Sequence, residues 1–170
     1  SIDKVKIAVG GHSLGGYTAL ALCGTIPERR DDRIKAVLLF SSGVGSSVFK
    51  DGELASVTIP AMYLYGEKEA ADRRAGVTMK EHAERLFKNL AGPKYLLEVK
   101  GANHFSFNDN YSRRKGKWAE FLGGTGDQFD VIRRYGIAFL EHHVVGNAVD
   151  QLGKEDPALL EYRRPSAEKR

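Results

Sequence analysis

The 170-residue sequence predicts an α/β fold, with a mostly parallel sheet and helices on both of its faces. Segments patterned like strands alternate with segments patterned like helices along the chain. Two of the strand segments, Ile34–Phe40 and Pro60–Tyr65, are almost continuously apolar, which is typical of strands covered on both faces. Residues suited to chemistry follow several strands directly, and parallel sheets bind their ligands at the carboxyl ends of the strands.

Four strands are predicted in all. The first, Lys4–Val9, alternates apolar and other side chains and ends at two glycines. The two apolar segments Ile34–Phe40 and Pro60–Tyr65 are the second and third. The fourth, Tyr95–Val99, is ended by Gly101.

Three helices are predicted between and after these strands. Leu14–Cys23 is apolar nearly all round, so most of its sides should be buried. Thr78–Leu90 has one apolar stripe and starts with a capping box formed by its first residue and Glu81. Asp127–Val145 has an apolar face, and Gly146 is placed as its C-terminal stop. Residues 1–150 therefore form part of one domain, and residues 151–170 are expected to be a polar, flexible tail.

Composition excludes several classes of protein. At 42% hydrophobic and 28% charged residues, the chain is an ordinary globular domain and not a disordered segment. Its apolar runs are far shorter than the roughly 18 residues of a membrane span, so no transmembrane segment is predicted. The net charge of +4 is concentrated in Arg113–Lys117 and Arg163–Arg170, and no element combines basic and aromatic residues on one face. We therefore predict no nucleic-acid partner.

The sharpest motif is Gly11–Gly15, which has the pattern G-x-S-x-G between a strand and a helix. In that context the pattern predicts a nucleophile elbow, a tight turn that holds a serine hydroxyl above the sheet. Small neighbours let the chain pass, and Ser13 becomes the candidate nucleophile. The backbone N–H of Leu14 would then point to the site where an oxyanion forms. The competing interpretation is a glycine-rich helix start with a capping serine.

A serine nucleophile needs a base, and His104 is the best candidate among five histidines. It lies in a loop just after the fourth strand, at the end of the sheet where chemistry collects. His12 adjoins the serine and should leave the turn in another direction, and His82 should be solvated on its helix. His142 and His143 fit packing or surface roles near the end of the last helix.

The third group must be a carboxylate that orients the imidazole and stabilises its cationic form. In chain order it should fall between the serine and the histidine. Glu67, Glu69 and Asp72 all follow the third strand and compete for this role. A solvated acidic turn, balanced by neighbouring basic residues, is the alternative.

Together these motifs resemble the α/β-hydrolase superfamily, and within it the dienelactone-hydrolase, platelet-activating-factor-acetylhydrolase and cutinase-like esterases. The resemblance is carried by Gly11–Gly16, Ile59–Gly66, the loop around His104 and the late helix with Ala138–Leu140. It implies that the acid lies three residues after the glycine ending its strand, which is Glu69. The family usually has Asp there, so Asp72 or Glu67 stay open as alternatives.

The resemblance also implies that the chain is the C-terminal half of the fold, because in that family further strands precede the strand of the elbow. The N-terminal strands would be missing, together with the loop that donates the second oxyanion N–H. We therefore expect a companion, either the N-terminal part of the same gene product or a separate chain, although a homo-oligomer could also pair the edge strands.

The predicted function is hydrolysis of carboxylic esters by a serine hydrolase, through a Ser-His-acid triad and an acyl-enzyme. Its substrate would be a small-molecule or lipid-like ester, with the loop Asn108–Gly126 beside the entrance. Ser13 favours esterase chemistry, because dienelactone hydrolases proper use cysteine, and Cys23 fits a core position. No motif indicates a metal or another cofactor. The alternatives are a non-catalytic or partner-binding relative, and an amide or peptide hydrolase on the same fold.

Overall fold

The computed structural model of the chain describes residues 3–42, 48–69, 76–109 and 126–165. Its strands are β1 (Ile7–His12), β2 (Ile34–Phe40), β3 (Ala61–Gly66), β4 (Lys94–Val99) and β5 (Leu159–Arg163). They form one five-stranded sheet in the order β1-β2-β3-β4-β5. The first four strands are parallel, and β5 is antiparallel to β4.

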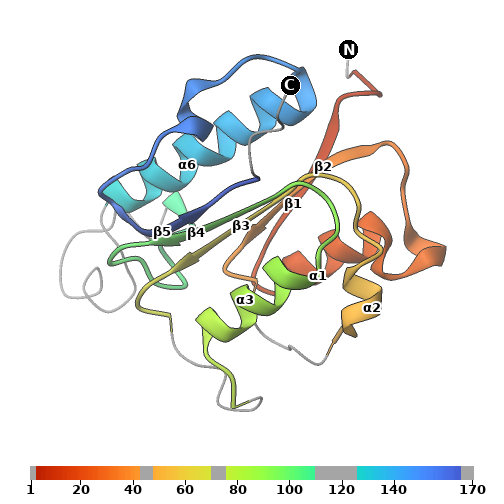
Figure 1. Ribbon diagram of the computed structural model, residues 1–170, viewed down its shortest axis with the longest axis horizontal. Helices are drawn as coiled ribbons and strands as arrows, with labels where there is room; N and C mark the ends of the chain where they lie inside the picture. The colour runs from red at the N-terminus through yellow and green to blue at the C-terminus, as the bar shows by residue number, and fades with distance from the viewer. Residues whose placement is uncertain (1–2, 43–47, 70–75, 110–125, 166–170) are drawn as a thin grey trace.

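Helices cover both faces of the sheet, as the sequence predicts. The α-helices are α1 (Gly15–Leu20), α2 (Asp51–Leu54), α3 (Met79–Asn89) and α6 (Gly126–Leu140). Shorter turns of 3-10 or π type occupy Ala21–Thr25, Pro27–Arg29, Glu141–Val145 and Asp150–Gly153. The first three α-helices lie on one face of the sheet and α6 on the other (Figure 1).

The sheet separates two hydrophobic cores, which explains why its central strands are apolar without alternation. On β2, Val37 and Leu39 enter the core shared with α1, α2 and α3, while Ala36 and Leu38 enter the core beneath α6. All residues of β3 are buried in the same way. Cys23 belongs to the first core, and burial raises the pKa of its thiol to about 12.

The helix ends follow the capping signals in the sequence. Thr78 Oγ1 accepts a hydrogen bond from the Glu81 N–H at 3.1 Å, and the Glu81 carboxylate accepts one from the Thr78 N–H at 2.7 Å. The last helical segment ends at Gly146, whose φ is 92°. The first helix is shorter than predicted, because after Leu20 the chain enters a wide turn in which Gly24 has a φ of 124°.

The prediction of a polar, flexible tail over residues 151–170 is wrong for residues 151–165, which the structure describes, because they contain β5. Tyr162 packs against Tyr135 with ring centroids 5.3 Å apart, and Arg163 on the opposite face forms an ion pair with Glu84 of α3. An edge strand needs apolar side chains on one face only. The charged residues of the other face made this segment look like a solvated tail.

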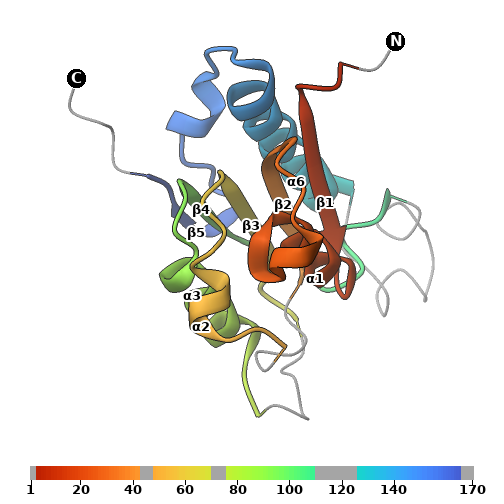
Figure 2. The same cartoon turned by 90° about the vertical axis from the view of Figure 1, so that its right-hand side faces the viewer.

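At the opposite side of the sheet, β1 has a free edge (Figure 2). Within the described ranges it pairs only with β2. Val5, just before β1, is 68% exposed. Leu14, just before α1, is 69% exposed, so the predicted helix Leu14–Cys23 is buried on fewer sides than its composition predicts. None of the described helices is long and apolar enough to cross a membrane.

Candidate active site

The turn after β1 has a strained backbone at Ser13, the candidate nucleophile. Ser13 has a φ of 55°, and among the described residues only Ser41 shares a positive φ without being glycine. Its N–H donates to the Phe40 carbonyl at 3.0 Å, and its own carbonyl accepts from the Gly16 N–H at 3.1 Å, where α1 begins. A non-glycine residue holds this conformation only where its surroundings enforce it, and such strain concentrates at functional sites.

Two glycines make the turn possible for steric reasons. A Cβ on Gly11 would lie 2.1 Å from the Gly15 carbonyl oxygen, and one on Gly16 would lie 2.0 Å from Ser42 Oγ. At Gly15 a Cβ would meet none of the described atoms within 4 Å. The space is therefore required at positions 11 and 16, and the final glycine of the G-x-S-x-G pattern is not sterically required by the described residues.

The structure brings Glu69 and His104 together at the carboxyl ends of β3 and β4. Glu69 Oε2 lies 3.3 Å from His104 Nδ1, and Glu69 Oε1 accepts from the Gly66 N–H at 2.8 Å. The carboxylate side chain is 2% exposed and the imidazole 35% exposed. The two loops approach closely because Gly66 has no side chain: a Cβ there would lie 2.4 Å from the Ala102 carbonyl oxygen.

Of the two competing carboxylates, only Glu67 belongs to the described residues, and its printed partner is not the imidazole. Glu67 instead accepts a hydrogen bond from the Gly101 N–H at 2.7 Å. Asp72 lies outside the described residues, as does nearly all of the predicted entrance loop. Among the described acids, Glu69 is therefore the one in position to orient His104.

Ser41 is part of this cluster, and sequence reasoning missed it. Its hydroxyl is hydrogen-bonded to Glu69 Oε2 and lies 2.6 Å from His104 Nδ1. Ser41 comes directly after β2, the strand between those of the elbow and the acid. Its position directly after a predicted strand is the one sequence feature that could have marked it as a site residue. The serines and glycines that follow β2 predict only that the strand ends there.

His12 lies beside the candidate base, contrary to the expectation that it would leave the turn in another direction. Its Nε2 donates to the His104 carbonyl oxygen at 2.8 Å, and the two ring centroids are 4.6 Å apart. Burial of the ring lowers the pKa of His12.

Two of the other histidines have different partners. His82 was expected to be solvated, but it is buried, and its Nε2 donates to the Ser42 carbonyl at 3.0 Å. The reason is that it lies on the apolar side of α3, next to Met79 and Ala83. His143 packs near Tyr95, with Nε2 3.1 Å from the tyrosine hydroxyl, and burial lowers its pKa to about 4.

For Ser13 itself, the described residues provide no hydrogen-bond partner for Oγ, and Leu14 presents its N–H at the start of α1 without a described acceptor. The residue before it, His12, contacts His104, but no described hydrogen bond joins Ser13 to His104. Within the described ranges, no group of three or more His, Cys, Asp or Glu side chains is arranged to hold a metal ion.

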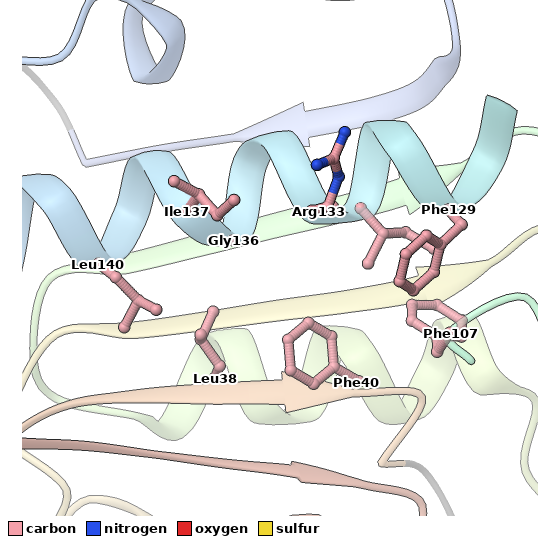
Figure 3. A pocket seen from close by; sticks show the side chains of 9 residues that line it. Leu38, Phe40, Phe107, Phe129, Arg133, Gly136, Ile137 and Leu140 are labelled. Carbon is pink, nitrogen blue, oxygen red and sulfur yellow. The ribbon is translucent and has the colours of Figure 1, made fainter. Parts of the chain in front are cut away.

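An apolar pocket of about 220 Å³ opens between β2 and α6 (Figure 3). Leu38 and Phe40 rise from β2 toward the helix, and Gly136 leaves room above them. The remaining lining residues are Phe107, Phe129, Ile132, Arg133, Ile137 and Leu140. None of the candidate catalytic residues lines this pocket, although Phe107 at one end stacks on His12 with centroids 6.0 Å apart.

Comparison with solved structures identifies the fold. A ferulic acid esterase from Streptomyces cinnamoneus matches 94% of this chain with a TM-score of 0.68 and 24% sequence identity. This chain spans 48% of the esterase's length. No protein-family model matches the chain, and no curated protein sequence matches it significantly. The described residues thus have an α/β-hydrolase-type fold, matched to part of the larger esterase.

The two glycines after the serine give a matched test of the elbow. We expect Gly16→Ala to lower the free energy of unfolding by about 1–3 kcal/mol, because the new Cβ overlaps Ser42. Gly15→Ala should change it by less than about 1 kcal/mol, since the space is open and alanine favours helix. Denaturant unfolding of both variants is the measurement, and equal destabilisation by the two would contradict this account of the turn.

Proposed function

We propose that the protein is a serine hydrolase that cleaves carboxylic esters. The observation that carries this proposal is the pairing of a buried carboxylate, Glu69, with His104 at the same sheet edge as the strained turn of Ser13. The α/β-hydrolase-type fold and its likeness to a ferulic acid esterase support it. Strained serine, imidazole and oriented carboxylate are the three parts that acyl transfer by a serine requires.

In the proposed reaction, His104 Nε2 removes the proton of Ser13 as Oγ attacks the ester carbonyl carbon. The tetrahedral oxyanion accepts a hydrogen bond from the Leu14 N–H and from a donor outside the described residues. Collapse breaks the bond to the alcohol, which leaves with the proton from His104. A water molecule then gives a proton to the same nitrogen and attacks the acyl-enzyme. The bond to Ser13 Oγ breaks, His104 returns the proton to Oγ, and the acid is released.

The electrostatics of the site suit this cycle. The Glu69 carboxylate lies on the Nδ1 side of His104, so its charge stabilises the imidazolium that forms in each half-reaction. Burial lowers the pKa of His12, which favours the neutral form of its ring. No cofactor takes part in these steps.

The proposed substrates are small-molecule or lipid-like esters. The similar solved structure is a ferulic acid esterase, so an aromatic acyl group belongs in the first substrate panel beside aliphatic esters of several chain lengths. Among the subfamilies that the sequence resembles, Ser13 favours the platelet-activating-factor-acetylhydrolase and cutinase-like esterases over thiol-dependent dienelactone hydrolases. Ester substrates compared with peptide anilides distinguish this proposal from amide or peptide hydrolysis.

Replacing the nucleophile is the first test of the proposal. In the natural full-length protein, Ser13→Ala should lower kcat for p-nitrophenyl esters by about 10⁴-fold or more, because no acyl-enzyme can form. Thermal unfolding should change little, since one hydroxyl is lost. Retained ester hydrolysis in this variant would contradict the proposal, and an inactive parent protein would favour a non-catalytic, partner-binding role.

The choice of acid has a matched control in Glu67, the residue directly after the strand end at Gly66. Glu69→Gln should lower kcat by about 10²–10⁴-fold, because the amide keeps the Gly66 hydrogen bond but loses the charge that stabilises the imidazolium. Glu67→Gln should leave kcat nearly unchanged, since its side chain can still accept from Gly101. Steady-state kinetics of both variants decide this. If Asp72→Asn proves the damaging change instead, the assignment of Glu69 is wrong.

We also propose that a further polypeptide segment pairs with the free edge of β1 and supplies the second oxyanion donor. The position of β1 at the end of the sheet supports this, because within the described ranges it pairs only with β2, and an unpaired edge strand favours pairing with another strand. The segment would come from the same gene product or from a separate chain.

The companion proposal predicts poor behaviour of residues 1–170 alone. Because loss of one oxyanion donor costs about 10²–10³ in rate, we expect them to be a weak esterase and prone to association. The test measures the mass in solution and the ester kinetics of residues 1–170 beside those of the natural protein. A monomeric 18.7 kDa species that unfolds cooperatively and has full activity would contradict the companion segment, and an active dimer would favour a second copy.

A further inference from the structure

We infer that Ser41 is a positioning residue, whose buried hydroxyl bridges Glu69 and His104 and holds His104 in the tautomer with the proton on Nδ1. This inference rests on the proposed function, because it assigns Ser41 a part in the same reaction. Ser41 would not touch the substrate. It would act through the two side chains between which it lies.

The distances favour a hydroxyl bridge over a direct contact between acid and base. His104 Nδ1 lies 2.6 Å from Ser41 Oγ and 3.3 Å from Glu69 Oε2. An ionised carboxylate can only accept, so the Ser41 O–H donates to Glu69 and its oxygen accepts the proton carried by Nδ1. With the proton fixed on Nδ1, Nε2 keeps its lone pair and can act as the base.

The backbone of Ser41 indicates that its side chain has a use. Its φ is 48°, and the residue is fully buried. Its N–H donates to the Leu64 carbonyl at 2.8 Å, which fixes it between β2 and β3. Glycine would adopt this conformation without strain. A serine here accepts that strain and places a hydroxyl where a buried carboxylate needs a donor.

The next residue connects the same turn to the elbow. Ser42 Oγ donates to the Gly11 carbonyl at 3.1 Å and lies against Gly16. Consecutive serines thus contact the two halves of the proposed site, Ser42 the elbow and Ser41 the acid and base. The turn after β2 therefore contacts both the turn of Ser13 and the pair of Glu69 and His104.

The test replaces Ser41 by glycine in the natural full-length protein. Ser41→Gly removes the hydroxyl while allowing the positive φ, so the fold should be retained. We expect kcat for ester hydrolysis to fall at least about tenfold with KM nearly unchanged. Ser41→Ala should reproduce this fall. Tyr135→Phe is the matched control, because it also removes a buried hydroxyl, hydrogen-bonded to the Lys154 carbonyl at 2.9 Å, and should leave kcat unchanged.

A second readout requires no catalysis. In proton NMR spectra, the His104 Nδ1–H should give a strongly downfield resonance that Ser41→Gly shifts or loses and Tyr135→Phe leaves in place. An active protein in which Ser41→Gly keeps both its kcat and this resonance overturns the inference and leaves the proposed function intact. If the natural protein hydrolyses no ester, the proposed function fails, and the resonance alone tests whether Ser41 bridges Glu69 and His104. Its loss in Ser41→Gly then supports the bridge, and its persistence overturns it.

Discussion

The arrangement at the carboxyl end of the sheet depends on the burial of one carboxylate. Glu69 is almost completely removed from solvent, and a buried charge is costly unless hydrogen bonds and an opposite charge compensate it. The Gly66 N–H and the Ser41 hydroxyl supply the hydrogen bonds, and His104 can supply the charge. The contacts that compensate the buried carboxylate therefore also orient the imidazole of His104.

The parallel sheet brings these partners together from distant parts of the chain. Ser13 follows β1, Ser41 follows β2, Glu69 follows β3 and His104 follows β4, and these strands are neighbours in that order. Each of these strands therefore ends close in sequence to one of the four residues, and hydrogen bonds join three of them, Ser41, Glu69 and His104. Non-glycine residues with positive φ stand at the first two of these positions, where the chain must turn sharply and still present a hydroxyl.

The sequence could predict the residues whose signals are local. The crowded turn at Gly11 and Gly16, the capping box of α3 and the two-sided burial of β2 all depend on short patterns, and the structure has each of them. The preference for Glu69 over Glu67 and Asp72 rests on its offset from Gly66. That offset comes from the resemblance to the α/β-hydrolase superfamily and not from a physical pattern in the sequence.

Residues whose roles depend on which strands lie side by side could not be predicted from short sequence patterns. Ser41 contacts partners 28 and 63 residues away, and its position beside them depends on the order of strands in the sheet. The burial of His82 depends likewise on how α3 packs against the sheet. β5 was missed because its charged residues, among them Arg163, have their partners on α3 rather than in solvent. In each case the missing information was tertiary.

The most direct measurement of the central claim is a crystal structure of the natural full-length protein after reaction with an organophosphonate ester. The account predicts a covalent bond from phosphorus to Ser13 Oγ and a phosphonyl oxygen within hydrogen-bond distance of the Leu14 N–H. It also predicts that His104 Nε2 faces the adduct, with Nδ1 held by Ser41 and Glu69. An adduct on another residue, or an imidazole turned away from Ser13 with Glu69 bound elsewhere, would contradict it.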